Sequence, residues 1–172
     1  MKTSLMALFA VSTLAGCSSI SVEECQTADW YQTGYRDGQN GNNPNIVNDY
    51  ASDCAEANIV VDKVAWQKGF SQGTRLYCAP NNGYVVGSQG RTYYGVCDSD
   101  QFLKNYQLGK LEYQRQQRLT ELNNQIADLD RQISSADKGD SKKLERLRAQ
   151  RKDLARERSS LLTPNVNFRF DF

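Results

Sequence analysis

An aromatic and glycine pattern occurs twice in the first half of the chain and limits how it can fold. The copies are Trp30-Tyr31-Gln32-Thr33-Gly34-Tyr35-Arg36-Asp37-Gly38 and Trp66-Gln67-Lys68-Gly69-Phe70-Ser71-Gln72-Gly73. In both, an aromatic residue follows the first glycine and a second glycine comes four residues after the first. Residues four apart share one face of a helix, and glycine lets another backbone approach that face closely. The pattern favours closely packed helices with aromatic side chains filling the gaps.

A fainter third copy, Tyr106-Gln107-Leu108-Gly109, follows later in the chain. Close packing of helices is the simpler explanation of all three copies. The alternative is a binding module for cell-wall sugars or peptides, in which aromatic rings stack on the ligand. Its candidate binding residues are Trp30, Tyr35, Trp66 and Phe70.

The segment between Tyr77 and Asp98 is rich in turn-forming residues. It contains a Pro-Asn-Asn-Gly sequence and three further glycines, which flank or separate the strand-prone runs Tyr84-Val85-Val86 and Thr92-Tyr93-Tyr94. We therefore expect a small, irregular β-hairpin here.

The chain has five cysteines. Cys17 belongs to the N-terminal segment, and Cys25, Cys54, Cys78 and Cys97 lie between that segment and the second half of the chain. An even number in an exported chain indicates two disulfides, whereas zinc would require close cysteine pairs that are absent. A Cys54–Cys78 bond is disfavoured because we expect residues 55–72 to be mainly helical, and a helix of this length would hold its two ends about 27 Å apart. Of the two remaining schemes, Cys25–Cys54 with Cys78–Cys97 is preferred because the second bond closes a compact, turn-rich loop.

The N-terminal residues have the composition of an export signal. A positive charge is followed by an apolar stretch over residues 5–15, shorter than the roughly 20 residues needed to span a membrane. Leu14-Ala15-Gly16-Cys17 resembles the lipobox of bacterial lipoproteins, which implies cleavage before Cys17 and acylation of that cysteine. Because Ser18 rather than aspartate follows, the resemblance also implies sorting to the outer membrane. The alternative is an ordinary signal peptide that happens to precede a cysteine.

The absence of histidine argues against several kinds of site. It removes the usual base of hydrolase triads and the commonest zinc ligand. An enzyme would need a carboxylate pair such as Asp29 and Asp37, but acids eight residues apart on one helix suit glycoside hydrolysis poorly. We therefore expect no enzymatic activity, no catalytic residues, no metal and no cofactor.

The second half of the chain has the spacing of paired helices. Leu119, Leu122, Ile126, Leu129 and Ile133 are followed, after a break at residues 134–140, by Leu144, Leu147, Leu154 and Leu161. The steps of three and four residues predict an antiparallel coiled-coil hairpin over residues 110–162.

Residues 110–162 contain 13 basic and nine acidic residues, against six and ten in residues 17–109. The second helix holds most of this positive charge. Its long side chains either cover a thin apolar seam or meet anionic lipid or an acidic protein. Nucleic acid is not expected as a partner of an exported protein.

The C-terminal residues after Pro164 alternate between apolar and polar side chains, as in a β-strand. They also resemble the last strand of outer-membrane barrel proteins. Val166, Phe168, Phe170 and Phe172 are therefore candidates for recognition by barrel-assembly or periplasmic quality-control proteins through strand addition. The alternatives are a strand that pairs within this protein and a frayed tail.

Several motifs of the first half, in the same order, resemble an uncharacterised family of bacterial lipoproteins, domain-of-unknown-function family 2799. The resemblance covers roughly residues 25–113 and implies an envelope location, without an assigned activity or catalytic residues. Asp98 stands where members often have proline. The matching segments are Asp29-Trp30, Gly34-Tyr35-Arg36-Asp37-Gly38, Gly69-Phe70-Ser71-Gln72-Gly73, Tyr77-Cys78-Ala79-Pro80, Asn82-Gly83-Tyr84, Gly87, Gly90-Arg91, Tyr94-Gly95-Val96-Cys97, Phe102, Tyr106 and Gly109.

Together these features predict a mainly α-helical protein with a small, irregular β component. The expected parts are a lipoprotein signal peptide (1–16), an anchor and short linker (17–24), a disulfide-bonded glycine and aromatic module (25–109), a helical hairpin (110–162) and a C-terminal strand or tail (163–172). The expected role is that of a non-enzymatic scaffold or interaction protein. It would be lipid-anchored to the outer membrane, face the periplasm and contact another envelope protein.

Overall fold

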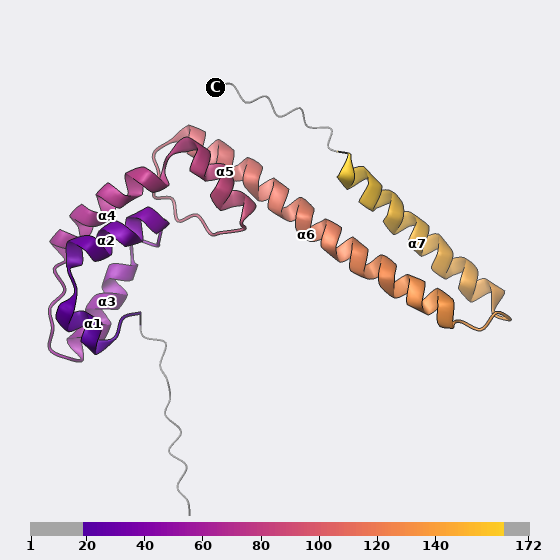
Figure 1. Cartoon of the computed structure of the whole chain (residues 1–172), viewed down its shortest axis with the longest axis horizontal. Coiled ribbons are helices and arrows are strands. Elements are labelled where there is room, and N and C mark those ends of the chain that lie inside the picture. Colours follow the sequence, from indigo (N-terminus) through magenta and orange to yellow (C-terminus); the bar gives the residue numbers. More distant parts are fainter. Residues whose placement is uncertain (1–18, 164–172) are drawn as a thin grey trace, which may run out of the picture. The chain divides into compact units, whose positions relative to one another are not determined.

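The computed structural model describes residues 19–163, which fold mainly into helices (Figure 1). The chain divides between Leu76 and Tyr77 into two compact units. The first unit contains α1 (Val22–Thr27), α2 (Trp30–Asn40), α3 (Ile46–Ala55) and all but the last residue of α4 (Lys63–Tyr77). The second contains α5 (Pro80–Ser88), α6 (Asp100–Ser135) and α7 (Ser141–Leu162).

Local sequence signals set the ends of the first helices. Ser21 and Glu24 form a capping box at the start of α1, each side chain accepting a hydrogen bond from the other residue's backbone N–H. At the start of α2, the Asp29 carboxylate accepts a hydrogen bond from the Gln32 N–H at 3.0 Å. Gly41 caps the C-terminal end of α2, and its φ of 67° is in the left-handed region that glycine adopts readily.

In the first unit, α2 and α4 pack backbone to backbone through the glycines of the repeated pattern. A Cβ on Gly34 would overlap the backbone oxygen of Trp66, and one on Gly38 would overlap that of Phe70. Because the contacted residue advances along α4 as the glycine advances along α2, the two helices run parallel. Figure 1 shows them side by side.

The same contacts occur from the α4 side. A Cβ on Gly69 would overlap the Tyr31 oxygen, and one on Gly73 would overlap the Tyr35 oxygen. Gly34 and Gly69 hold equivalent places in the two copies of the pattern, as do their contacts Trp66 and Tyr31. The two helices are therefore related by an approximate two-fold axis, and the sequence repeat is a repeat of packing positions.

Aromatic side chains and a disulfide complete the first unit. Trp66 is fully buried and stacks on Phe70, with ring centroids 4.7 Å apart. The Cys25–Cys54 disulfide connects α1 to α3, and Cys54 is also fully buried.

In the second unit, the strands expected at residues 84–86 and 92–94 are wrong: residues 80–88 form helix α5, and residues 91–98 are irregular. Gly83 and Gly87, four residues apart, place α5 against α6, and Val86 is fully buried in the core formed with Tyr77 and Phe102. Packing thus overrides the β propensity of the valines. The predicted C-terminal strand lies outside the described residues.

The packing of α5 on α6 repeats that of α2 on α4. A Cβ on Gly83 would overlap the Phe102 oxygen, and one on Gly87 would overlap the Tyr106 oxygen. From α6, a Cβ on Gly109 would overlap the Tyr84 oxygen. The second unit is thus another parallel helix pair, and α5 carries a copy of the glycine pattern that the sequence analysis missed.

One position of this second pair differs from the first. Asn105 stands where the first pair has Gly69, and its side-chain amide donates a hydrogen bond to the Pro80 carbonyl oxygen at 2.9 Å. Pro80 holds the place that Tyr31 has in α2. A side-chain hydrogen bond therefore replaces a glycine contact to the equivalent carbonyl.

The second disulfide, Cys78–Cys97, connects the chain just before α5 to the chain just before α6. Tyr93 organises the connection between them, because its hydroxyl accepts a hydrogen bond from the Cys97 N–H and donates one to the Cys97 oxygen. Both disulfides are the pairs that the sequence analysis prefers.

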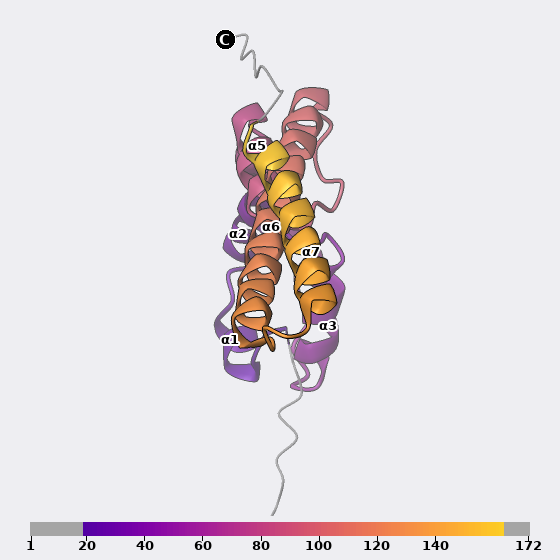
Figure 2. The same cartoon turned by 90° about the vertical axis from the view of Figure 1, so that its right-hand side faces the viewer.

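Helices α6 and α7 lie side by side and run in opposite directions, forming the predicted helical hairpin (Figures 1 and 2). Leu119, Leu122 and Leu147 are buried between them. The turn falls within the predicted break, since α6 ends at Ser135 and α7 starts at Ser141. Because α6 is continuous from Asp100, one helix contributes to both the glycine-packed pair and the hairpin.

We expect Gly69→Ala to destabilise the first unit by about 2 kcal/mol, because the added Cβ forces α2 and α4 apart. The higher helix propensity of alanine, about 1 kcal/mol, offsets only part of a larger steric cost. Chemical denaturation followed by circular dichroism measures the free energy of unfolding.

Gly139→Ala is the matched control. A Cβ at Gly139 would contact only the Asp137 side chain, at an ordinary 3.4 Å. Equal losses of stability in the two variants would contradict the proposed role of the glycine contact.

Candidate functional site

The aromatic residues predicted as a possible binding site lie mostly in the core of the first unit. Trp30, Trp66 and Phe70 are buried, with exposed fractions of 9%, 0% and 5%, and Tyr35 is half-buried. Trp30 packs near Tyr50, with ring centroids 6.2 Å apart. Since these rings contact one another and the helix backbones, they offer little free surface on which a sugar could stack.

Of the two acids in the repeat, Asp29 caps α2, whereas Asp37 lies inside the unit at 6% exposure. The Asp37 carboxylate accepts hydrogen bonds from Trp66 Nε1 at 2.8 Å, Asn42 Nδ2 at 2.9 Å and the Tyr50 hydroxyl at 3.3 Å. Burial, together with the negative charge of Asp37, raises the pKa of Tyr50 to about 12. Asp37 therefore links α2, the following loop, α3 and α4.

The described residues hold no group of three or more histidine, cysteine or acidic side chains placed to bind a metal. None of the helices within residues 19–163 is both long and apolar enough to cross a membrane. The predicted lipidation site Cys17 and the C-terminal candidates Val166, Phe168, Phe170 and Phe172 lie outside the described residues.

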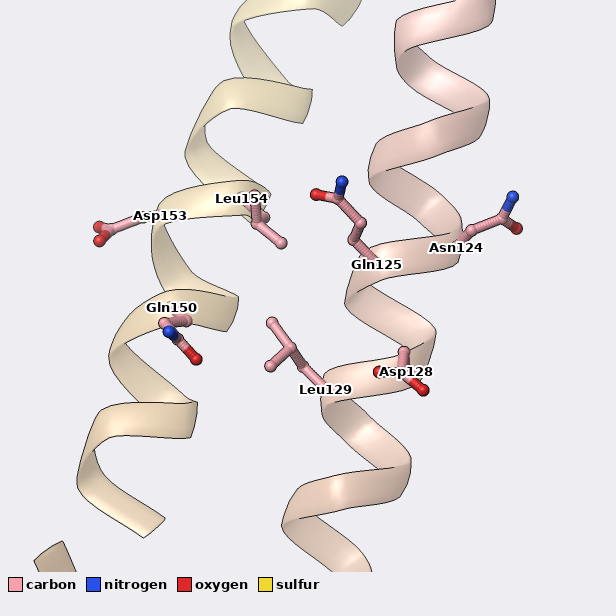
Figure 3. A pocket seen from close by; sticks show the side chains of 7 residues that line it. All are labelled: Asn124, Gln125, Asp128, Leu129, Gln150, Asp153 and Leu154. Carbon is pink, nitrogen blue, oxygen red and sulfur yellow. The ribbon is translucent and has the colours of Figure 1, made fainter. Parts of the chain in front are cut away.

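A groove with a volume of about 630 Å³ lies between α6 and α7. In Figure 3, Leu129 and Leu154 point towards each other from opposite helices, while Asp153 and Asn124 point outwards. We call this site the hairpin groove. Its lining residues are Asn124, Gln125, Asp128, Leu129, Gln150, Asp153 and Leu154.

Different side-chain contacts connect α6 and α7 on the two sides of the leucine seam. On the side away from the groove, Arg151 forms an ion pair with Asp130, and Arg158 donates a hydrogen bond to the Asn123 side chain at 2.7 Å. The helical repeat places these four residues across the leucine seam from the groove residues. Arg151 and Arg158, two of the basic residues predicted to cover the seam, therefore connect the two helices on this side of it.

On the groove side, the cross-hairpin ion pair joins Arg118 and Glu157 at 2.7 Å and marks one end of the groove. Farther towards the turn, the residues that flank the leucines are carboxylates and amides, without a cation among the groove-lining residues. Both carboxylates form ion pairs within their own helices, Asp128 with Arg131 at 3.0 Å and Asp153 with Arg156 at 3.4 Å. The groove thus combines an apolar floor with polar rims.

The sequence indicates the leucine seam but not the groove. The heptad spacing indicates which residues face the opposite helix. It does not indicate which side of the seam the arginines bridge, because this depends on the register of α7 against α6.

We expect Asp37→Asn to lower the free energy of unfolding by about 1 to 3 kcal/mol, because an amide NH₂ facing a buried donor leaves that donor without an acceptor. Denaturant titration monitored by tryptophan fluorescence measures the change. The control is Asp62→Asn, an exposed helix cap whose remaining oxygen still accepts the hydrogen bond from the Ala65 N–H. Equally small effects in both variants would show that the Asp37 network does not stabilise the fold.

Comparison with known proteins identifies one family. Residues 29–111 match the model of the family described as "Protein of unknown function (DUF2799)". No curated protein and no solved structure matches the chain. The matched segment runs from the cap of α2 into the first third of α6 and so includes both glycine-packed helix pairs. The match to this uncharacterised family therefore covers residues 29–111 of the chain.

Proposed function

We propose that the protein is a non-enzymatic lipoprotein of the outer membrane that faces the periplasm and contacts another envelope protein through its helical hairpin. The observation that carries the envelope location is the pairing of four of the five cysteines in two disulfides. Such bonds persist in oxidising compartments such as the periplasm. The fifth cysteine is Cys17, in the lipobox-like sequence.

The start of the folded chain supports an anchor at Cys17. Ser19 donates hydrogen bonds to the Asp53 carboxylate from its N–H at 2.7 Å and from its hydroxyl at 2.6 Å. The described fold therefore starts two residues after Cys17. A lipid on Cys17 would hold the first unit close to the membrane surface.

The hairpin groove supports a contact function. Leu129 and Leu154 are only partly buried, so the hairpin leaves apolar surface available on this side. We propose that its partner is an amphipathic helix, whose apolar face contacts the leucines and whose polar side chains face the amides and ion pairs of the rim.

We expect Cys17→Ser to abolish labelling by radioactive palmitate and to release the protein from the membrane fraction. Ser18→Asp is the matched variant: it should retain the label but move the protein to the inner membrane, in a host that sorts lipoproteins by this residue. Palmitate labelling that persists in Cys17→Ser would contradict the anchor.

A photoreactive amino acid at Gln150, in the groove, should crosslink in intact cells to a helix that carries polar residues beside its apolar face. The control position is Ala149, an exposed neighbour on the same turn but outside the groove-lining set. Leu154→Gln should reduce the yield several-fold while circular dichroism confirms an unchanged helix content. The proposed contact would be overturned if positions 150 and 149 gave the same crosslinked peptides. It would also be overturned if Leu154→Gln left the crosslinking yield at position 150 unchanged.

A further inference from the structure

Helix α6 packs against α5 with one face and against α7 with another, and the second face extends past the end of α7. Its α5 face includes Phe102, Tyr106 and Gly109. Its α7 face includes the buried Leu119 and Leu122.

Helical spacing extends the α7 face of α6 towards Leu108 and Leu111. These side chains are 37% and 62% exposed, so the end of this apolar face is uncovered within residues 19–163.

The end of α7 explains why these leucines are exposed. Arg115, on the same face of α6, donates a hydrogen bond to the Leu161 oxygen at 2.9 Å, so α7 ends at this level. Leu162, the last residue of α7, is 50% exposed. Leu111 and Leu108 lie about 6 and 10 Å farther along α6, in the direction in which α7 was running.

We propose that residues 164–172 of the same chain bind over Leu111 and Leu108 and complete the apolar face that α7 leaves open. They follow α7 directly, and nine residues can span up to about 30 Å. This reach covers both leucines. The inference does not depend on the lipid anchor or on the hairpin groove.

The sequence of this segment fits the surface. It contains Val166, Phe168, Phe170 and Phe172, one apolar residue at every second position. A period of two can place all four on one side of a chain segment. Farther along the same face of α6, the exposed Lys104 supplies a positive charge for Asp171.

The test uses the full-length chain with a photoreactive amino acid at Leu111. We expect crosslinks within one chain, between position 111 and residues 164–172, with a yield independent of protein concentration. The control position is Gln117, an exposed residue on the opposite side of α6, which should give none of these products.

Two further variants identify the contact. Replacing Phe168 and Phe170 with serine should reduce the intrachain yield at position 111 several-fold, whereas Arg169→Gln should leave it unchanged. Crosslinks between two copies, crosslinks only to another protein, or equal yields from positions 111 and 117 would each overturn the proposal. Loss of palmitate labelling or of the groove crosslink would not affect it.

Discussion

The close contact between glycine Cα atoms and carbonyl oxygens of a neighbouring helix is the constraint on which both units depend. Because a Cβ at any of these glycines would overlap backbone atoms of the neighbouring helix, the close approach at each of these positions requires glycine. A contact of this kind also brings Cα–H groups against carbonyl oxygens, a weak but recurrent attraction between helices. The aromatic residues beside the glycines then fill the space on either side of the contact.

When two helices of one chain pack in parallel, the connection between them must return to the level at which the first helix starts. In the first unit this connection contains α3, and in the second it is the irregular segment between α5 and α6. Each connection carries a cysteine, Cys54 or Cys97, bonded to a cysteine that precedes the first helix of the pair, Cys25 or Cys78. Both units therefore have the same order of parts: cysteine, glycine helix, returning connection with a cysteine, and second helix. This shared order indicates an internal duplication, and the family match spans both glycine-packed pairs.

The sequence predicts some of these features better than others. The pattern at Gly34 and Gly69 is recognisable because tryptophans and a second glycine accompany it. The helix expected between Cys54 and Cys78, together with the turn-rich segment before Cys97, favours the disulfides that the structure has. Helix α5 was missed because Pro80, Asn82 and Gly83 are typical of turns and Val85 is typical of strands. The segment is helical where Gly83 and Gly87 contact α6, a tertiary contact that the local sequence does not indicate. The hairpin groove was missed for a related reason: it depends on which arginines bridge the two helices, a property of tertiary register rather than of periodicity.

The most direct test of the glycine contact is a measurement of proton distances between α2 and α4 by nuclear magnetic resonance. Parallel, glycine-packed helices predict nuclear Overhauser contacts from the Gly34 α-protons to the Phe70 amide and from the Gly38 α-protons to the Thr74 amide. Contacts from these glycines that run in the reverse order along α4, or the absence of any interhelical contact from their α-protons, would contradict the account.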